Sequence, residues 1–278
     1  MRPFLGLLRK NLHDVRGTFL LSSMALFGLG WLFVFVTSLN EARIMKPLAD
    51  DDTGTRFRMM RAMGVDEESA SAAIMMTFWS HPFILLVVSI WAISRGSAAA
   101  SAEIERGTLD LILSRPVSRP AYLLSHVLVG MGGLLGLAMM LVAGAACALG
   151  FNYLRVPPRP AAFLGPGLNL AALGAPIYGY TLLASACDSV RWRPTMIGSV
   201  LTLGGFIALV ISLLPVFQDY PWRVYLERAS IFKLYNPVDA VGAAEHLARD
   251  VGLLLLIGAG CTGLALAAFI RRDLPANG

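Results

Sequence analysis

The side chains that could perform chemistry are few, and their spacing argues against the common catalytic and metal-binding arrangements. Cys147, Cys187 and Cys261 lie apart in apolar segments and form no Cys-x-x-Cys pair, so we expect neither a metal site nor a disulfide. Ser125 and His126 are adjacent, so on a helix they point to different faces and do not suit an intramembrane protease. No Gly-x-x-x-x-Gly-Lys-Ser/Thr phosphate loop occurs. We therefore expect this chain not to be an enzyme.

The composition predicts a membrane protein. Of the 278 residues, 56% are hydrophobic and 15% are charged, whereas soluble domains carry about 25% charged residues. The apolar residues form long blocks, and six blocks reach the length of about 20 residues that a helix needs to cross the hydrocarbon core. We expect an all-α integral membrane protein, with one transmembrane domain over residues 1–278. Its six predicted spans are residues 17–39, 72–94, 121–150, 168–187, 195–217 and 251–270.

Prolines and loop compositions refine this prediction. Pro82 lies in the second predicted span and Pro176 in the fourth, and we expect each to kink its helix because proline lacks a backbone donor. Residues 40–71 mix acidic and basic side chains, as a solvated outer loop would. Residues 218–250 are rich in aromatic side chains and are expected to form short helices at the outer membrane surface.

The positions of Lys and Arg predict the orientation in the membrane. With a cytoplasmic N-terminus, the inner segments are shorter than the outer ones yet hold slightly more Lys and Arg, placed beside the helix ends. We expect both termini in the cytoplasm and the chain in the plasma (inner) membrane. Residues 1–16 are amphipathic and predict an interface helix whose cations contact lipid phosphates. No Lys/Arg run indicates nucleic acid, and the net charge of +5 is modest.

The predicted spans contain almost no ionisable side chains. Ion-coupled carriers place charges or broken helices near the middle of the membrane, and channels line a pore with polar groups. The energy for work on a substrate would therefore come from outside the spans. Because the chain lacks a phosphate loop, ATP would have to be hydrolysed by a second polypeptide.

Residues 101–119, between the second and third predicted spans, are predicted to form a short helix with a defined start and end. The second helix is expected to continue past the membrane surface until Gly107 ends it. Thr108 follows as the predicted cap of a new short helix, which Pro116 ends. Pro120 suits the first turn of the third span.

The new short helix has one apolar face. Leu109, Ile112 and Leu113 share that face, and charged residues surround it. This form suits a helix that fits into a groove on a partner protein. The candidate partner-binding residues are Glu103, Glu105, Arg106, Gly107, Thr108, Leu109, Ile112, Leu113, Pro116, Val117 and Arg119.

The sequence AEIERGTLDLILSRPVSRP of residues 102–120 resembles the cytoplasmic loop of type-two ABC exporter permeases, particularly the branch that includes the permease for nitrous-oxide reductase maturation. Members of that branch show an acidic residue, then Gly-Thr-Leu, an aliphatic pair and Pro-Val-Ser-Arg. The matching positions here are Glu105, Gly107, Thr108, Leu109, Leu111, Leu113, Pro116, Val117, Ser118 and Arg119.

The resemblance implies a function and a set of partners. Residues 101–119 would be the coupling helix, which docks into an ABC-type ATP-binding subunit. ATP and Mg²⁺ would bind to that partner, and this chain would hold no cofactor. A second permease copy or a paralogue would complete a dimer surrounded by membrane lipids.

Two other functions remain open from the sequence. A membrane scaffold or assembly factor without transport would have no ATP-binding partner. An ion-coupled secondary carrier would lose activity when the ion gradient collapses, and the scarcity of charge in the spans disfavours it.

Overall fold

The computed structural model describes residues 2–39, 72, 75–114, 117–154, 157–217, 219–242 and 244–272. Over these ranges the chain is helical and contains no strand. The described chain is therefore all-α. Five of its helices are long and apolar enough to cross a membrane, which suggests a multi-pass membrane protein. These helices are α1 (Arg2–Leu39), α8 (Arg119–Ala148), α9 (Leu164–Cys187), α10 (Trp192–Leu213) and α13 (Ala244–Arg271).

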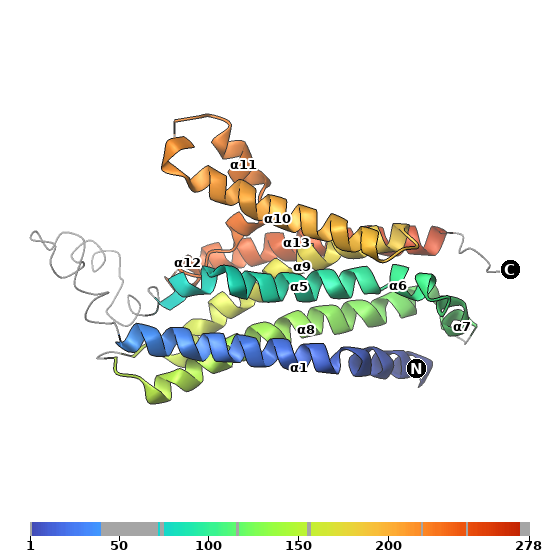
Figure 1. The fold of residues 1–278 in the computed structure, drawn as a ribbon, viewed down its shortest axis with the longest axis horizontal. Coiled ribbons are helices and arrows are strands. Elements are labelled where there is room, and N and C mark those ends of the chain that lie inside the picture. The colour runs from blue at the N-terminus through green and yellow to red at the C-terminus, as the bar shows by residue number, and fades with distance from the viewer. Residues whose placement is uncertain are drawn as a thin grey trace, which may run out of the picture.

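The helices lie along one long axis, and the two ends of the bundle differ (Figure 1). Both termini lie at the end that carries the short helix α7 (Leu109–Leu113), which we call the α7 end. The other end carries α11 (Arg223–Ala229) and α12 (Asp239–Gly242). With the 3-10 helix η5 (Ile231–Leu234), these confirm that short helices form within residues 218–250. The predicted loop 40–71 lies outside the described residues.

The structure breaks the predicted second span where we expected only a kink. The 3-10 helix η1 (Phe78–Ser80) ends at His81, and α5 (Pro82–Ala98) begins at the next residue. His81 is extended, with φ −63° and ψ 135°, and its Nδ1 accepts a hydrogen bond of 3.3 Å from the Phe83 amide. His81 is therefore an N-cap, and Pro82 occupies the first turn, where a missing N–H costs nothing. By contrast, α9 remains one helix through Pro176.

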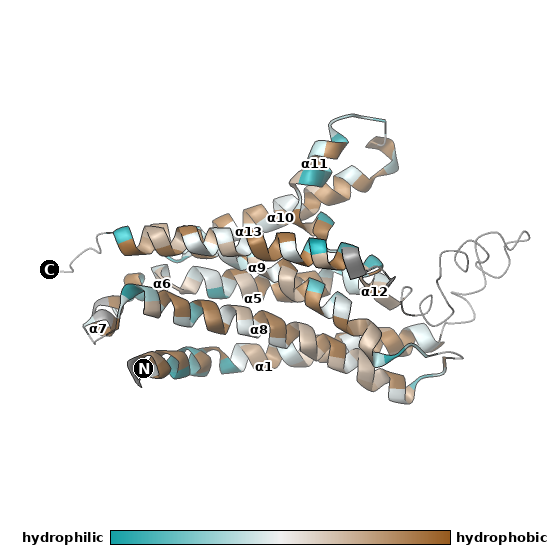
Figure 2. Ribbon diagram, turned by 180° about the vertical axis from the view of Figure 1, so that it is seen from behind, coloured by the Kyte–Doolittle hydropathy of each residue, from teal (hydrophilic) through white to brown (hydrophobic). Residues whose placement is uncertain are grey.

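The predicted interface segment and the predicted first span are not separate helices. Residues 2–39 form one continuous helix of 38 residues. Single glycines at 6 and 17 do not interrupt it, because an isolated glycine weakens a helix without ending it. The first half of α1 is still the more hydrophilic half, as Figure 2 shows near the N-terminus.

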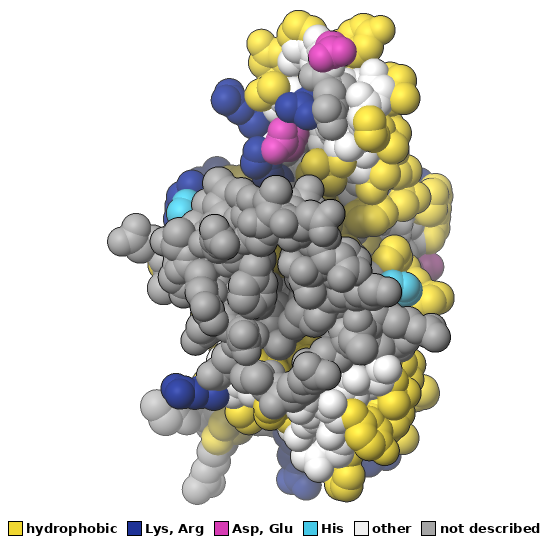
Figure 3. Space-filling view, turned by 90° about the vertical axis from the view of Figure 1, so that its left-hand side faces the viewer, with side chains coloured by type: hydrophobic (Ala, Val, Ile, Leu, Met, Phe, Trp, Pro, Cys, Tyr) yellow, Lys and Arg dark blue, Asp and Glu magenta, His cyan; other side chains and the backbone are white. Residues whose placement is uncertain are grey.

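The core is built around α9, whose most apolar window is 78% buried. It lies among α5, α8, α10 and α13, and α1 packs on the far side against α8. The corresponding window of α10 is only 17% buried, so most of its apolar side chains face outward. Figure 3 shows hydrophobic side chains along the flanks, and acidic and basic ones gathered where α11 lies. An apolar surface of this extent suits lipid contact.

Helices α1 and α8 touch through their backbones at two glycines. A Cβ atom added to Gly144 of α8 would overlap the Phe27 carbonyl of α1, and one added to Gly30 of α1 would overlap the Leu141 carbonyl of α8. Small residues permit this approach, which matters in lipid because apolar side chains gain little from leaving an apolar solvent.

Replacing Gly144 with valine is therefore expected to destabilise the α1–α8 contact. Inserting a branched side chain into a packed contact costs roughly 1–3 kcal/mol. Thermal unfolding of the detergent-solubilised protein would measure the loss. Gly132→Val is the matched control on the same helix, because nothing lies within 4 Å of a Cβ at that position. Equal destabilisation by both substitutions would contradict the backbone contact.

Candidate functional site

The turn at Gly107 ends a helix as predicted, but that helix is α6 (Ser101–Glu105), which is separate from α5, so the predicted continuous extension of the second helix is interrupted at Ala99 and Ala100. Gly107 has a positive φ of 66°, and its amide donates to the Ile104 carbonyl at 3.0 Å. The next amide, of Thr108, donates to the Glu103 carbonyl at 3.0 Å. This pair of bonds is the Schellman motif, which places a glycine in the left-handed region directly after a helix. The turn fixes the direction in which α7 leaves α6.

The Glu103 side chain joins three elements at this turn. Its carboxylate accepts a hydrogen bond of 2.9 Å from the Lys10 ammonium of α1, and a second one from the Thr108 hydroxyl. The hydroxyl of Thr108, the residue predicted to cap α7, donates to Glu103. Asp14 lies 3.9 Å from Lys10 and completes a small charged cluster.

Burial and hydrogen bonding act in opposite directions on Glu103. Burial raises the pKa of this carboxyl, but the hydrogen bonds from Thr108 and Lys10 stabilise the ionised form and lower it further than burial raises it. The net pKa lies below the ordinary value. The Glu103 side chain is 9% exposed and that of Lys10 is 41% exposed, so the pair is partly shielded from water.

The apolar face of α7 points inward, which corrects the predicted docking face. Leu109 is 3% exposed, and Ile112 packs partly buried against the core, as does Val117 after the helix. The exposed apolar residue is Leu111, at 70%. The inward orientation buries apolar area, at roughly 25 cal/mol per Å². The Leu113 side chain and the whole of Pro116 lie outside the described residues.

Two other predicted partner-binding residues are bound within the chain. The Glu105 carboxylate accepts a hydrogen bond of 2.9 Å from the Arg191 amide at the start of α10. The Arg119 guanidinium donates to the carbonyls of Ile270 and Arg272, at 3.2 and 2.7 Å. A cation at these carbonyls suits the negative end of the α13 dipole. Arg119 therefore fixes the start of α8 to the end of the last helix.

The start of α8 agrees with the sequence prediction. Ser118 is extended and its hydroxyl accepts a hydrogen bond of 3.4 Å from the Ala121 amide. Pro120 lies in the first turn, where its missing N–H leaves no bond unmade. The loop is thus bounded by a glycine turn before α7 and a serine cap after it.

Side-chain hydrogen bonds connect five helices around the α7 end in a closed circuit, which we call the end ring. These bonds are partly or fully buried, and a buried bond left unmade is costly. The links run from α8 to α13 through Arg119, from α13 to α9 through Arg272, from α9 to α6 through Ser185, which also bonds to α5, from α6 to α1 through Glu103 and Lys10, and from α1 back to α8 through Asn11 and Ser125.

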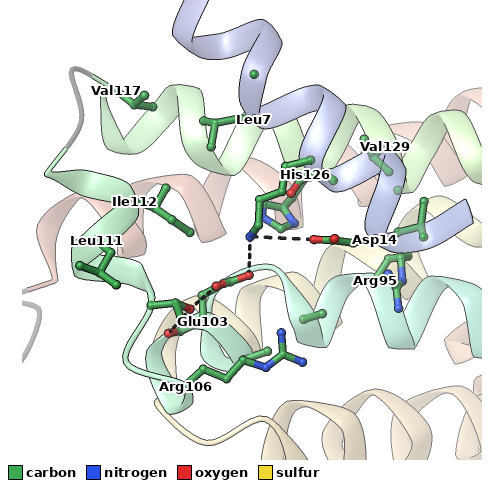
Figure 4. A pocket seen from close by; sticks show the side chains of 18 of the residues that line it. Leu7, Asp14, Arg95, Glu103, Arg106, Leu111, Ile112, Val117, His126 and Val129 are labelled. Atoms are coloured by element: carbon green, nitrogen blue, oxygen red, sulfur yellow. Dashed lines mark hydrogen bonds and ion pairs between the residues drawn. The ribbon is translucent and has the colours of Figure 1, made fainter.

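The end ring borders a cavity of about 990 Å³. Figure 4 shows its side chains arriving from α1, α5, the α6–α7 turn and α8. Its lining contains both apolar and charged side chains. The charged and ionisable lining residues are Lys10, Asp14, Arg95, Glu103, Arg106, His126 and Arg191.

Sequence reasoning found only part of this site. It selected Glu103 and Arg106 in the loop, but not Lys10, which is 93 positions from its partner Glu103. One signal was present: cations of α1, α5 and α10 were each placed beside the same membrane surface. That common level brings them within reach of one another.

Metal ligation finds no support in the described part of the chain. Among the described residues, no three His, Cys, Asp or Glu side chains lie close enough together to hold a metal ion. The three cysteines are free thiols in the structure.

Comparison with known proteins assigns this chain to no family. No protein-family model matches the chain, and searches of curated proteins and of solved structures give no match.

Replacing Glu103 with glutamine is expected to destabilise the protein by about 1–2 kcal/mol at pH 7, because the charge-assisted bonds to Lys10 and Thr108 weaken. The folded-state pKa of Glu103 is lowered, so its contribution is present above the ordinary pKa, near 4.5, and is lost as the pH falls through the lowered value. The stability difference between wild type and variant should therefore shrink in acid. Thermal unfolding from pH 7 to pH 3 would measure it.

Glu105→Gln is the matched control for this substitution. Its amide oxygen can still accept the single bond from the Arg191 amide, so we expect a much smaller loss. A stability difference for Glu103→Gln that stays constant over the pH range would contradict the Glu103 assignment.

Substitutions at Gly107 are expected to follow the tolerance for positive φ. Valine should cost more than about 1–2 kcal/mol, while asparagine should cost less, because asparagine enters the left-handed region more easily. Unfolding measurements on the two variants would rank them. The reverse order would show that the turn is not held at positive φ.

Proposed function

We propose that the chain is the transmembrane permease subunit of an ABC transporter that acts as an exporter. ATP hydrolysis on a separate nucleotide-binding subunit, docked at α7, drives it. The observation that carries this proposal is α7 itself, a short helix at the end of the bundle, set between a glycine turn and a serine cap (Figure 1). The likeness of residues 102–120 to the loop of type-two permeases supports the same assignment.

The exposed surface of α7 suits a groove on a partner. Leu111 presents an apolar side chain with 70% of its surface exposed, and Glu105 and Arg106 nearby are also exposed. An apolar centre with a charged rim is the usual arrangement of a helix-in-groove contact. In this proposal Leu111 replaces the predicted face of Leu109, Ile112 and Leu113 as the centre of the contact. Leu109 and Ile112 pack α7 against the permease.

The connections of α7 provide a route for motion into the bundle. On one side it continues through the Gly107 turn into α6 and α5, and on the other it leads through Ser118 into α8. The Glu103–Lys10 pair adds α1. A displacement of α7 by the partner would thus act on three long helices together. ATP shifts the assembly only by as much as it binds one state better than the other.

The orientation follows from the same assignment. The α7 end would face the cytoplasm, where ATP is available, and both termini lie at that end. Arg95, Arg106, Arg191 and Arg271 lie there too, as the positive-inside rule requires of a cytoplasmic face. The outward apolar side chains of α10 would meet lipid or a second permease copy.

Leu111→Asp is expected to abolish association with the ATP-binding subunit, because a charge would replace the apolar centre of the contact. The tagged chain would be purified from its native membranes, and bound ATP-binding polypeptides would be detected by photolabelling with azido-ATP. Capture should fall at least roughly tenfold, as for loss of an interface hot spot.

Two variants control this experiment. Leu111→Met keeps an apolar side chain and should retain capture. Tyr225→Asp introduces the same charge at a residue that is 72% exposed on α11, at the opposite end, and should also retain it. Finding no azido-ATP-labelled polypeptide with wild type would refute the proposed function, and undiminished capture by Leu111→Asp would refute docking at α7.

A further inference from the structure

The cavity at the α7 end carries more positive than negative charge. Four cationic side chains line it, against the two carboxylates of Asp14 and Glu103. Lys10 is already paired with both carboxylates. Among the residues that the structure describes, no carboxylate lies within ion-pair distance of Arg95, Arg106 or Arg191. Like charges facing one cavity repel, so an anion between them would stabilise the arrangement.

Two buried nitrogen atoms on the cavity lining lack hydrogen-bond partners within the described chain. They are Nε of Arg95 and Nε2 of His126. A buried polar atom without a partner costs about 1–3 kcal/mol. Figure 4 shows both side chains at the cavity, with Arg106 reaching in from the α6–α7 turn. The site therefore offers donors to a ligand with several acceptor oxygens.

Apolar side chains also line the cavity. They are Leu7 and Val15 of α1, Ile112 of α7 and Val129 of α8. A ligand that matches both the charged and the apolar lining is an amphiphile, with an anionic head and an apolar body. The volume of about 990 Å³ is also far larger than a lone phosphate ion needs.

The location favours a membrane lipid as that amphiphile. On α1, the helix that forms one wall, Leu5 and Leu12 are 59% and 52% exposed, so apolar side chains face outward at the level of the cavity. The apolar helices continue directly from this level, with α8 spanning Arg119–Ala148. Cations at this height meet phospholipid phosphates in a bilayer.

We propose that this cavity binds the phosphate-bearing head group of an anionic membrane lipid. Arg95, Arg106 and Arg191 bind the phosphate oxygens, since a guanidinium matches phosphate with paired hydrogen bonds. The apolar side chains of the lining contact the beginning of the acyl chains. The bound lipid connects α1, α5, the α6–α7 turn and α10. This site goes beyond the proposed transport function and does not depend on an ATP-binding subunit.

The test uses the full-length protein alone, without an ATP-binding subunit. It is placed in phosphatidylcholine nanodiscs with increasing phosphatidylglycerol, and thermal unfolding is followed. Native mass spectrometry of the released protein counts retained phosphatidylglycerol. We expect the midpoint of unfolding to rise with phosphatidylglycerol, and one or more molecules of it to remain bound.

Arg95→Gln/Arg106→Gln is expected to weaken this lipid response by roughly tenfold or more in phosphatidylglycerol concentration, given the worth of each cation near anionic lipid. Arg223→Gln/Arg228→Gln removes the same charge from α11 at the opposite end and should respond as wild type does. Arg191→Gln, at the start of α10, gives a second and milder variant with an intermediate response. It keeps the test decisive if the double variant does not fold in phosphatidylcholine alone.

Three results would overturn the proposal. The first is no rise in the midpoint of unfolding and no retained phosphatidylglycerol in wild type. The second is an undiminished response in both Arg95→Gln/Arg106→Gln and Arg191→Gln. The third is full stabilisation by inorganic phosphate in phosphatidylcholine nanodiscs, which would assign the site to a soluble anion. Leu111 also lines this cavity, so Leu111→Asp is not a control here. The lipid response is measured without an ATP-binding subunit, so failure of α7 docking and failure of this site are distinguishable.

Discussion

The carboxylate of Glu103 is withdrawn from water at the point where α1, α6 and α7 meet. A buried charge without partners costs several kcal/mol, so the fold must supply donors at fixed positions. Lys10 and Thr108 supply them, and the Gly107 turn brings Thr108 back over the helix that carries Glu103. The direction of α7 and the contact between α6 and α1 thus follow from one requirement.

The bundle away from this junction is held by another kind of contact. In lipid, apolar side chains gain little by leaving solvent, and helices associate through close packing. The backbone contacts at Gly30 and Gly144 and the enclosure of α9 are of this kind. The hydrogen-bonded end ring occupies the level where the chain passes from lipid to water. Close packing therefore fixes the distances between helices, and polar bonds fix their relative positions at the α7 end.

Local rules were enough to predict from the sequence where several helices end. Gly107 and Pro120 act within their own turns, so their roles needed no tertiary information. Pro82 could also have been read as a helix start, since proline favours the first turn. The orientation of α7 could not be predicted: a helix of five residues with leucine on both faces has no decisive period, and only packing against the rest of the bundle distinguishes the buried Leu109 from the exposed Leu111. The cavity likewise joins cations that are remote in sequence.

The end ring is a closed circuit, and a closed circuit behaves differently from a row of bonds. When one link in a row is cut, the pieces separate; when one link in a circle is cut, every member is still reached from the other direction. Losing any single hydrogen bond among Arg119, Arg272, Ser185, Lys10 and Asn11 would leave five helices still tied through four remaining links. Because each helix of the end ring is held by links on two sides, a force on one helix is distributed over the others. The end ring therefore loses stability gradually as its hydrogen bonds are removed.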